Sequence, residues 1–201
     1  LHAVVAQLHA ATLRDSARAF LHELAHKTAI PETGGKEGLV TELQRRYAAV
    51  VERLPVKWRH RIEQGFEKIA EQRDSLGPAV LCHGDFTPWN TFFVDSKLYV
   101  FDWEYADHIY PAGYDAIHFL LSLPKIKRQP AAEKIKRVLK ELAEMHYLSD
   151  GSSIKPILLV YLCGHALQYM HRAPVEDGRI LSWDGSEEIA VLIDTKIAMK
   201  D

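Results

Sequence analysis

Three oxygen-bearing side chains stand close together near the middle of the chain. Asp85 and Asn90 lie five positions apart in a polar stretch that follows a short apolar run, and Asp102 follows two further apolar segments. Those two segments are typical of a β-hairpin, whose turn would bring Asp102 back toward the polar stretch. The spacing therefore predicts that two carboxylates and one amide converge.

These groups suit phosphoryl transfer, in which one carboxylate accepts the proton of the attacking hydroxyl while an amide oxygen and a second carboxylate hold Mg²⁺. The spacing of His83, Asp85 and Asn90 follows the H-x-D-x-x-x-x-N pattern of protein-kinase catalytic loops, with Gly84 at the usual arginine position. Asn90 is the only asparagine in the chain, so an accidental match is rare. The alternative is that Asp85 and Asn90 merely form a turn.

The surrounding pattern predicts the elements that position these residues. The apolar run 79–82 reads as a strand, the segments 91–94 and 98–101 as a hairpin around a turn at 95–97, and 114–123 as a helix. Before this region, apolar spacing predicts helices over 14–28, 36–54 and about 58–69, with a loop at 31–38. After it, helices are expected near 135–145, 157–171 and 189–197.

The expected architecture is a mostly helical α+β protein with a small β-hairpin insert that carries the polar loop. We expect a single unit over residues 1–201, made of a helical part (1–78), the loop and hairpin (79–123) and a second helical part (124–201). The helix over 157–171 is the most apolar, so we expect it at the centre of the core.

Composition bounds the class of protein. Of the 201 residues 47% are hydrophobic and 26% charged, which excludes a disordered chain. The balance of 25 basic and 27 acidic residues excludes a polycation that binds nucleic acid through overall charge. Cys82 and Cys163 lie in apolar runs and read as buried thiols of a reducing, cytoplasmic environment. No apolar run reaches membrane-spanning length, and the first residues do not resemble a signal peptide.

The chain resembles the aminoglycoside phosphotransferase and choline kinase group of kinase-like enzymes. The resemblance is carried by four stretches, Val5–His9, Cys82–Asn90, Phe101–Glu104 and Gly113–Asp115. It implies a protein-kinase-like C-terminal lobe that moves the γ-phosphate of ATP to a hydroxyl of a small molecule, with residues 124–201 forming the acceptor-binding region. The acceptors that fit the shared motif include an aminoglycoside, a choline-like amine and a sugar.

The resemblance also implies roles for individual residues. Asp85 would be the catalytic base, and His83 would support the catalytic loop by hydrogen bonding. Asn90 and Asp102 would hold Mg²⁺ and, through it, ATP. Asp115 would be a buried carboxylate that braces the loop. Glu104 would sit at the edge of the site, near metal-bound water or the acceptor. Apart from the resemblance, the aromatic rings of Trp89 and Trp103 make them candidates for contact with the acceptor.

One part of the family pattern is missing from this sequence. The family has an N-terminal nucleotide lobe with a strand lysine, whereas no strand–loop–strand precedes His83 here. The stretch Gly34–Gly38 lacks the spacing of a phosphate-binding P-loop and reads as a flexible loop between helices. We therefore expect a C-lobe whose N-lobe is absent, which would bind nucleotide weakly and turn over slowly or not at all. The alternative function is a catalytically silent kinase-like scaffold or binding module.

Other chemistry-bearing patterns have plainer interpretations. His22 and His26 belong to a His-Glu-x-x-His stretch, but a zinc hydrolase needs a third ligand and a cleft, so chance spacing on a helix is favoured. Seven basic residues over 125–140 could meet an anionic partner, yet a solvated helix face is favoured. The acidic cluster of Glu176, Asp177, Asp184, Glu187 and Glu188 could attract a cationic acceptor or simply be solvated. The aromatic residues near the motif could stack on a sugar, cage an ammonium group or only pack the hairpin.

Overall fold

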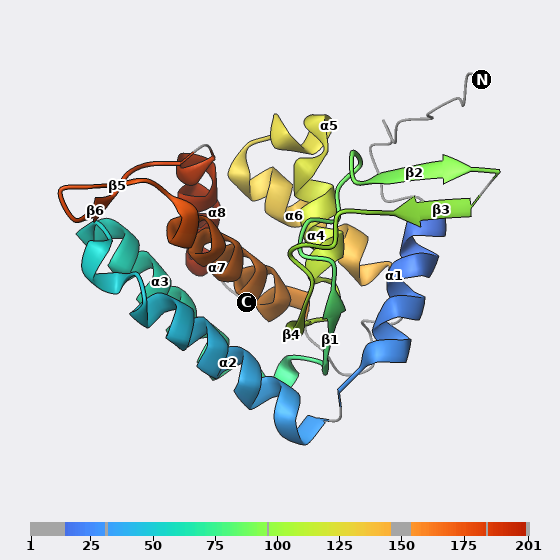
Figure 1. Ribbon diagram of the computed structural model, residues 1–201, viewed down its shortest axis with the longest axis horizontal. Coiled ribbons are helices and arrows are strands. Elements are labelled where there is room, and N and C mark those ends of the chain that lie inside the picture. The colour runs from blue at the N-terminus through green and yellow to red at the C-terminus, as the bar shows by residue number, and fades with distance from the viewer. Residues whose placement is uncertain (1–14, 31, 96, 146–153, 184, 200–201) are drawn as a thin grey trace.

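The computed structural model describes residues 15–30, 32–95, 97–145, 154–183 and 185–199, and it is mostly helical with small antiparallel sheets (Figure 1). The α-helices are α1 (Asp15–Thr28), α2 (Glu32–Ala48), α3 (Val56–Glu71), α4 (Tyr114–Ser122), α5 (Pro124–Lys127), α6 (Ala131–Ala143), α7 (Ile154–Arg172) and α8 (Ser186–Ala198). Two short 3-10 turns, η1 (Val51–Arg53) and η2 (Arg73–Ser75), flank α3. The strands are β1 (Ala79–Cys82), β2 (Thr91–Val94), β3 (Lys97–Val100), β4 (Asp107–Pro111), β5 (Val175–Glu176) and β6 (Arg179–Ile180).

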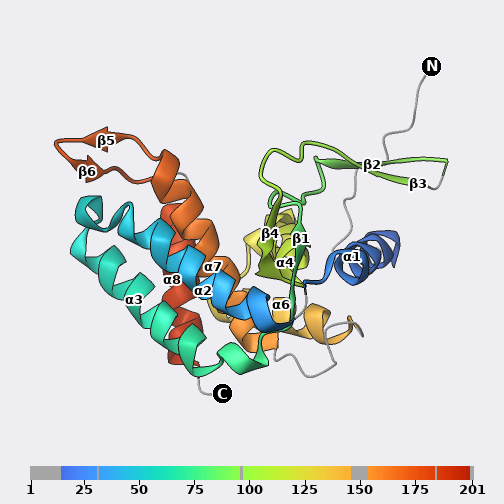
Figure 2. The same cartoon turned by 60° about the horizontal axis from the view of Figure 1, so that its bottom comes forward.

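Helix α7 is the centre of the core, as its continuous apolar sequence predicts. It contacts α2, α3, α4, α6 and α8, which surround it (Figure 2). Apolar residues are buried around its whole circumference from Ile157 to Leu162. The contact with α3 is close because Gly65 has no side chain: a Cβ there would lie 2.6 Å from the Sγ of Cys163. This helix thus fixes the positions of the helices that line the candidate site.

The predicted hairpin is confirmed, with a one-residue shift. β2 pairs with β3 from Thr91 opposite Val100 to Val94 opposite Lys97. Lys97, predicted in the turn, is therefore part of the second strand, and Phe101, predicted at its end, lies beyond the pairing. The turn is left with the shorter length at which hairpin strands pair most readily. Asp95 begins it with a positive φ of 47°.

The predicted loop at 31–38 is wrong, because α2 already begins at Glu32 and includes the glycine-rich stretch. Each glycine costs about 1 kcal/mol of helix propensity relative to alanine, which is why the pattern favoured a loop. Extension of an existing helix adds a backbone hydrogen bond for each residue, and this offsets the cost. The same helix ends at Ala48, earlier than the expected residue 54, and the chain then makes the separate turn η1.

Besides the 3-10 turns, four elements were not predicted from the sequence. β4 pairs antiparallel with β1, with Val80 opposite Tyr110 and Cys82 opposite Asp107. The short helix α5 follows α4 directly, and the strands β5 and β6 interrupt the segment 124–201, which was expected to be helical only. None of these segments is a continuous apolar run of the kind that predicted β1, β2 and β3.

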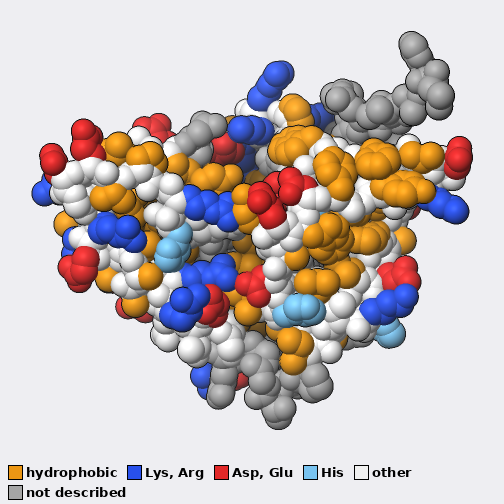
Figure 3. Space-filling view, viewed as in Figure 1, with side chains coloured by type: hydrophobic (Ala, Val, Ile, Leu, Met, Phe, Trp, Pro, Cys, Tyr) orange, Lys and Arg blue, Asp and Glu red, His pale blue; other side chains and the backbone are white. Residues whose placement is uncertain are grey.

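The hairpin β2–β3 projects beside α1 and presents apolar surface. Exposed side chains on or just after it include Val94, Tyr99, Phe101 and Trp103, and apolar atoms gather over this side of the molecule (Figure 3). Both cysteines are buried, as expected, and neither forms a disulfide. Among the described helices, none combines the length and apolar character needed to cross a membrane.

Candidate active site

The loop between β1 and β2 is held by a buried carboxylate at the start of α4. Asp115 accepts hydrogen bonds from the backbone N–H groups of His83, at 2.7 Å, and Gly84, at 3.0 Å. Burial raises the pKa of Asp115, while these two backbone donors favour its ionised form. The carboxylate therefore ties the first residues of the loop to a helix of the core, which is the bracing position expected for Asp115.

Gly84 is required where it stands. Its φ is +82°, and a Cβ at this position would lie 2.3 Å from the backbone oxygen of Tyr105. A side chain would be strained in this conformation and would also collide with the neighbouring chain. The glycine therefore lets the loop pass close beneath the segment that follows the hairpin.

His83 links the loop to the end of the hairpin. Its Nδ1 accepts the backbone N–H of Asp85 at 3.2 Å, so Nε2 carries the proton and donates to the carbonyl of Phe101 at 2.9 Å. The ring is fully buried and packs against Trp103, with ring centroids 4.6 Å apart. His83 thus supports the loop from the buried side and does not line the cavity that Asp85 faces.

Asp85 and Asn90 contact each other directly. The Asn90 Nδ2 donates to the Asp85 carboxylate oxygen Oδ2 at 2.8 Å and to the Asp85 backbone carbonyl at 3.0 Å. The backbone carbonyl of Asn90 accepts the N–H of Phe101 at 3.2 Å. Asp102 follows at once and is exposed, with a positive φ of 67°. The backbone of the hairpin end therefore meets the loop at Asn90. The convergence of the Asp102 carboxylate with Asp85 and Asn90 stays a prediction.

The second oxygen of Asp85 is bound by a residue that the sequence motif does not contain. His118 Nε2 lies 2.9 Å from Asp85 Oδ1, and His118 Nδ1 lies 2.9 Å from the hydroxyl of Tyr161. Burial pushes the pKa of Asp85 upward, but the hydrogen bonds from His118 and Asn90 outweigh it, so the net pKa is lowered. His118 lies one helical turn after Asp115, on an otherwise apolar segment of α4. A polar ring among buried apolar neighbours was the signal that could have found it.

Asp85 faces a cavity of about 200 Å³ built by α4, α5, α7 and α8. Its polar and aromatic lining includes Trp89, His118, Lys127, Tyr161, His165, Tyr169, Trp183 and Glu188. Of the acidic cluster, Glu188 faces this cavity and is paired with the buried Lys134 of α6. Glu176, Asp177 and Glu187 are exposed, and Asp184 lies outside the described residues.

The remaining sequence-predicted site residues are distributed around the loop. Trp89 lines the cavity beside Asp85, whereas Trp103 packs on His83 and donates its Nε1–H to the carbonyl of Val100 at 3.1 Å. Glu104 lines a different cavity, of about 460 Å³, together with Arg46 and Arg172. The structure thus brings Asp85, Asn90 and Trp89 together, whereas Glu104 lines a separate cavity.

Other patterns raised by the sequence lie away from this loop. His22 and His26 are exposed on α1, with ring centroids 6.4 Å apart, and no group of three or more His, Cys, Asp or Glu side chains among the described residues is placed to hold a metal. Ion pairs neutralise part of the basic segment, since Lys136 pairs with Glu133 and Arg137 with Glu141. The stretch Val5–His9 lies outside the described residues.

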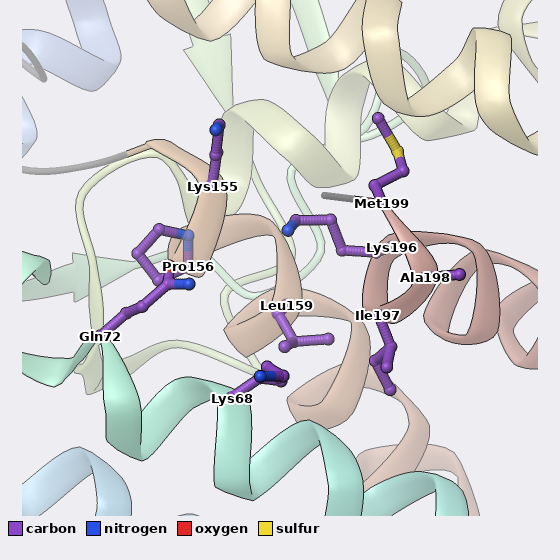
Figure 4. Close-up of a pocket in the computed structure, with 9 residues that line it drawn as sticks. All are labelled: Lys68, Gln72, Lys155, Pro156, Leu159, Lys196, Ile197, Ala198 and Met199. Carbon is purple, nitrogen blue, oxygen red and sulfur yellow. The ribbon is translucent and has the colours of Figure 1, made fainter. Parts of the chain in front are cut away.

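A lysine-rich cavity of about 310 Å³ lies between α3, the start of α7 and the end of α8, lined in part by Lys68, Lys155 and Lys196 (Figure 4). Its lining includes none of the residues of the loop or of the hairpin.

With the fold and the geometry of the loop described, comparison with known families gives the family of this chain. The model of the phosphotransferase enzyme family matches residues 1–148, so the chain belongs to this family of aminoglycoside phosphotransferase and choline kinase-like proteins. Among solved structures, the chain is similar to a choline/ethanolamine kinase family protein from Mesorhizobium loti, with 14% sequence identity and a TM-score of 0.49. The match covers 92% of this chain and 62% of that one. No curated protein matches the chain.

Proposed function

We propose that the chain is the kinase-like C-terminal lobe of an enzyme that transfers the γ-phosphate of ATP, with Mg²⁺, to a hydroxyl of a small molecule. The observation that carries this proposal is the Asp85 carboxylate. Both of its oxygens are held by hydrogen bonds, and the side chain faces a cavity of about 200 Å³. A carboxylate fixed in this way is the group that phosphoryl transfer needs beside the acceptor hydroxyl.

Asp85 is the proposed base. An ionised carboxylate has about four lone-pair sites on its two oxygens, so the bonds from Asn90 and His118 leave capacity for an acceptor hydroxyl in the cavity. As the acceptor oxygen attacks the γ-phosphorus, its proton passes to Asp85 and the bond from that phosphorus to the ADP oxygen breaks. The lowered pKa keeps Asp85 ionised at neutral pH, ready to accept the proton.

The residues expected to hold Mg²⁺ fit a hard cation. The Asn90 amide nitrogen is bonded to Asp85, so the side-chain oxygen is the atom left to face a cation. Asp102 adds a carboxylate from the hairpin end, which the backbone bond between Phe101 and Asn90 holds next to the loop. When bound, Mg²⁺ would neutralise charge that develops on the phosphates. His83 and Asp115 keep the loop in the shape that positions both groups.

The cavity lining supports an acceptor that carries a ring or an ammonium group. Trp89 and Trp183 offer aromatic faces on which either can pack. Glu188 could meet an amine, but its pairing with Lys134 leaves no strongly acidic wall. An aminoglycoside, a choline-like amine and a sugar all suit this lining. Glu104 and Trp103 do not line this cavity, so we propose no contact between them and the acceptor there.

The proposal is tested by the release of ADP from Mg²⁺–ATP, with kanamycin, choline and ribose as acceptors. We expect at least one acceptor to raise the rate, and we expect Asp85→Asn to lower that rate by about 10³-fold, within the range that removal of a general base gives. The matched control is Asp95→Asn, in the hairpin turn, which should keep the wild-type rate. Equal rates for Asp85→Asn and Asp95→Asn would contradict the assignment.

A further inference from the structure

A hydrogen-bonded chain runs from Asp85 into the core through two residues outside the catalytic loop. His118 of α4 lies 2.9 Å from Asp85 Oδ1 through its Nε2, and 2.9 Å from the Tyr161 hydroxyl through its Nδ1. Both α4 and α7 contact each other and belong to the buried core. The His118 side chain is only 11% exposed, so water competes little for these bonds. Asp85 is therefore linked to the rigid part of the molecule as well as to its own loop.

The chemistry of the three groups fixes the direction of the hydrogen bonds. An ionised carboxylate only accepts, so His118 Nε2 must carry a proton and donate to Asp85. In the uncharged ring Nδ1 is then an acceptor, and the Tyr161 hydroxyl is the donor that suits it. Burial holds the pKa of Tyr161 well above its ordinary value, so this residue stays a phenol that can donate. Tyr161 thus selects the His118 tautomer that binds Asp85.

The position of the carboxylate follows from two donors on opposite oxygens. Asn90 holds Oδ2 from within the loop, and His118 holds Oδ1 from α4. With one donor the carboxylate could rotate about its Cβ–Cγ bond, whereas two donors from different elements fix its plane. The plane matters because the acceptor hydroxyl must meet a free lone pair of Asp85 while it faces the phosphate.

We propose that His118, oriented by Tyr161, is a positioning residue that holds the Asp85 carboxylate in the plane from which it meets the acceptor hydroxyl. This inference rests on the proposed function, in which Asp85 is the base. His118 itself acts through Asp85.

The other ionisable groups around the pair come from five elements. They are His83 from the loop, Asp115 from α4, Lys127 from α5, His165 and Tyr169 from α7, and Glu188 from α8. His165 packs against both members of the chain, with ring centroids 5.1 Å from Tyr161 and 5.2 Å from His118. Burial lowers the pKa of His165 well below its ordinary value, so this ring stays uncharged beside His118.

Nuclear magnetic resonance on the full chain tests the positioning role without any activity. Histidine labelled with ¹⁵N reports the tautomer of His118. We expect the Nε2–H tautomer in the wild-type protein and a mixture of tautomers in Tyr161→Phe, because the phenol that donates to Nδ1 is then absent.

In the ADP-release assay with water as the acceptor, we expect His118→Phe, which keeps a ring but has no donor, to lower kcat about tenfold without a change in KM for ATP. His118→Gln restores a donor and should recover part of kcat. The matched control is His26→Gln, which changes an exposed histidine on α1 and should leave kcat and the His118 tautomer unchanged. The Nδ1–H tautomer in the wild-type protein, or an unchanged kcat in His118→Phe, would overturn the positioning role. Failure of the proposed function is a different result, namely ADP release that survives Asp85→Asn.

Discussion

At the scale of single residues, the spacing of His83, Asp85 and Asn90 was enough to predict that these groups share one loop. All three lie within eight positions between two apolar segments that read as strands. The structure places the Asn90 amide on Asp85 and the Asp115 carboxylate under the loop. His118 could not be predicted in the same way. The contact between His118 and Asp85 depends on how α4 packs against the loop. No spacing within the motif encodes that packing.

Gly84 gives the sharpest structural prediction at this scale. Gly84→Ala would place a Cβ at 2.3 Å from the backbone oxygen of Tyr105 while φ is +82°. We expect a loss of about 2–4 kcal/mol in the free energy of unfolding, because backbone strain and a backbone collision add together. Urea unfolding measures it. The matched control is Gly178→Ala, where φ is +73° but no atom lies within 4 Å of the Cβ; a loss no larger than in this control would contradict the close approach.

At the scale of elements, segments with a clear apolar pattern were predicted, both the long helices and the four-residue strands β1, β2 and β3. Segments without such a pattern were missed. Helix α7 was found because its apolar run is long and continuous. Strand β4 was missed because it is a five-residue segment that ends in proline, and its pairing with β1 depends on residues far away in sequence. The glycine-rich start of α2 was predicted as a loop because glycine has a low helix propensity. In the structure the helix extends through these residues.

Arg46 couples α2 to the missed strand. It donates to Asp107 at 2.8 Å and to the Tyr110 hydroxyl at 2.7 Å, and Glu42 accepts from it at 2.8 Å. Glu42 also accepts two bonds from Arg45. The Arg45 hydrogen bond, opposed by burial and aided by Arg46, lowers the pKa of Glu42 from 4.5 to about 2.

This lowered pKa makes the stability of the α2–β4 contact depend on pH. The unfolded chain binds the Glu42 proton more readily, so the contribution of Glu42 is present above pH 4.5 and is lost as the pH falls toward 2. We expect Glu42→Gln to cost about 1–2 kcal/mol at pH 7, less than the full linkage value because Arg45 is largely exposed. The difference from the wild-type protein in urea unfolding should shrink between pH 5 and 2. A difference that stays constant across this window would contradict the account.

At the scale of the whole molecule, the chain places its candidate base where helices from both halves of the sequence meet. The loop comes from the first half, while α7 and α8 supply much of the cavity that Asp85 faces. The sequence predicted helical structure for this second half but not which side chains would reach the cavity. A cavity depends on the relative placement of several helices, and apolar periodicity gives only the buried face of each.

The measurement that tests the central claim most directly is a thermal-shift titration of the chain with ATP, with and without Mg²⁺. A ligand that binds only the folded state raises the melting temperature as its concentration exceeds Kd. If Asn90 and Asp102 form a metal–nucleotide site, Mg²⁺–ATP should raise the melting temperature of the wild-type chain, and Asp102→Ala should lose the rise. Asp95→Ala, at the opposite end of the same hairpin, should keep it. An equal rise in Asp102→Ala, or a rise that persists when EDTA removes the metal, would contradict the account.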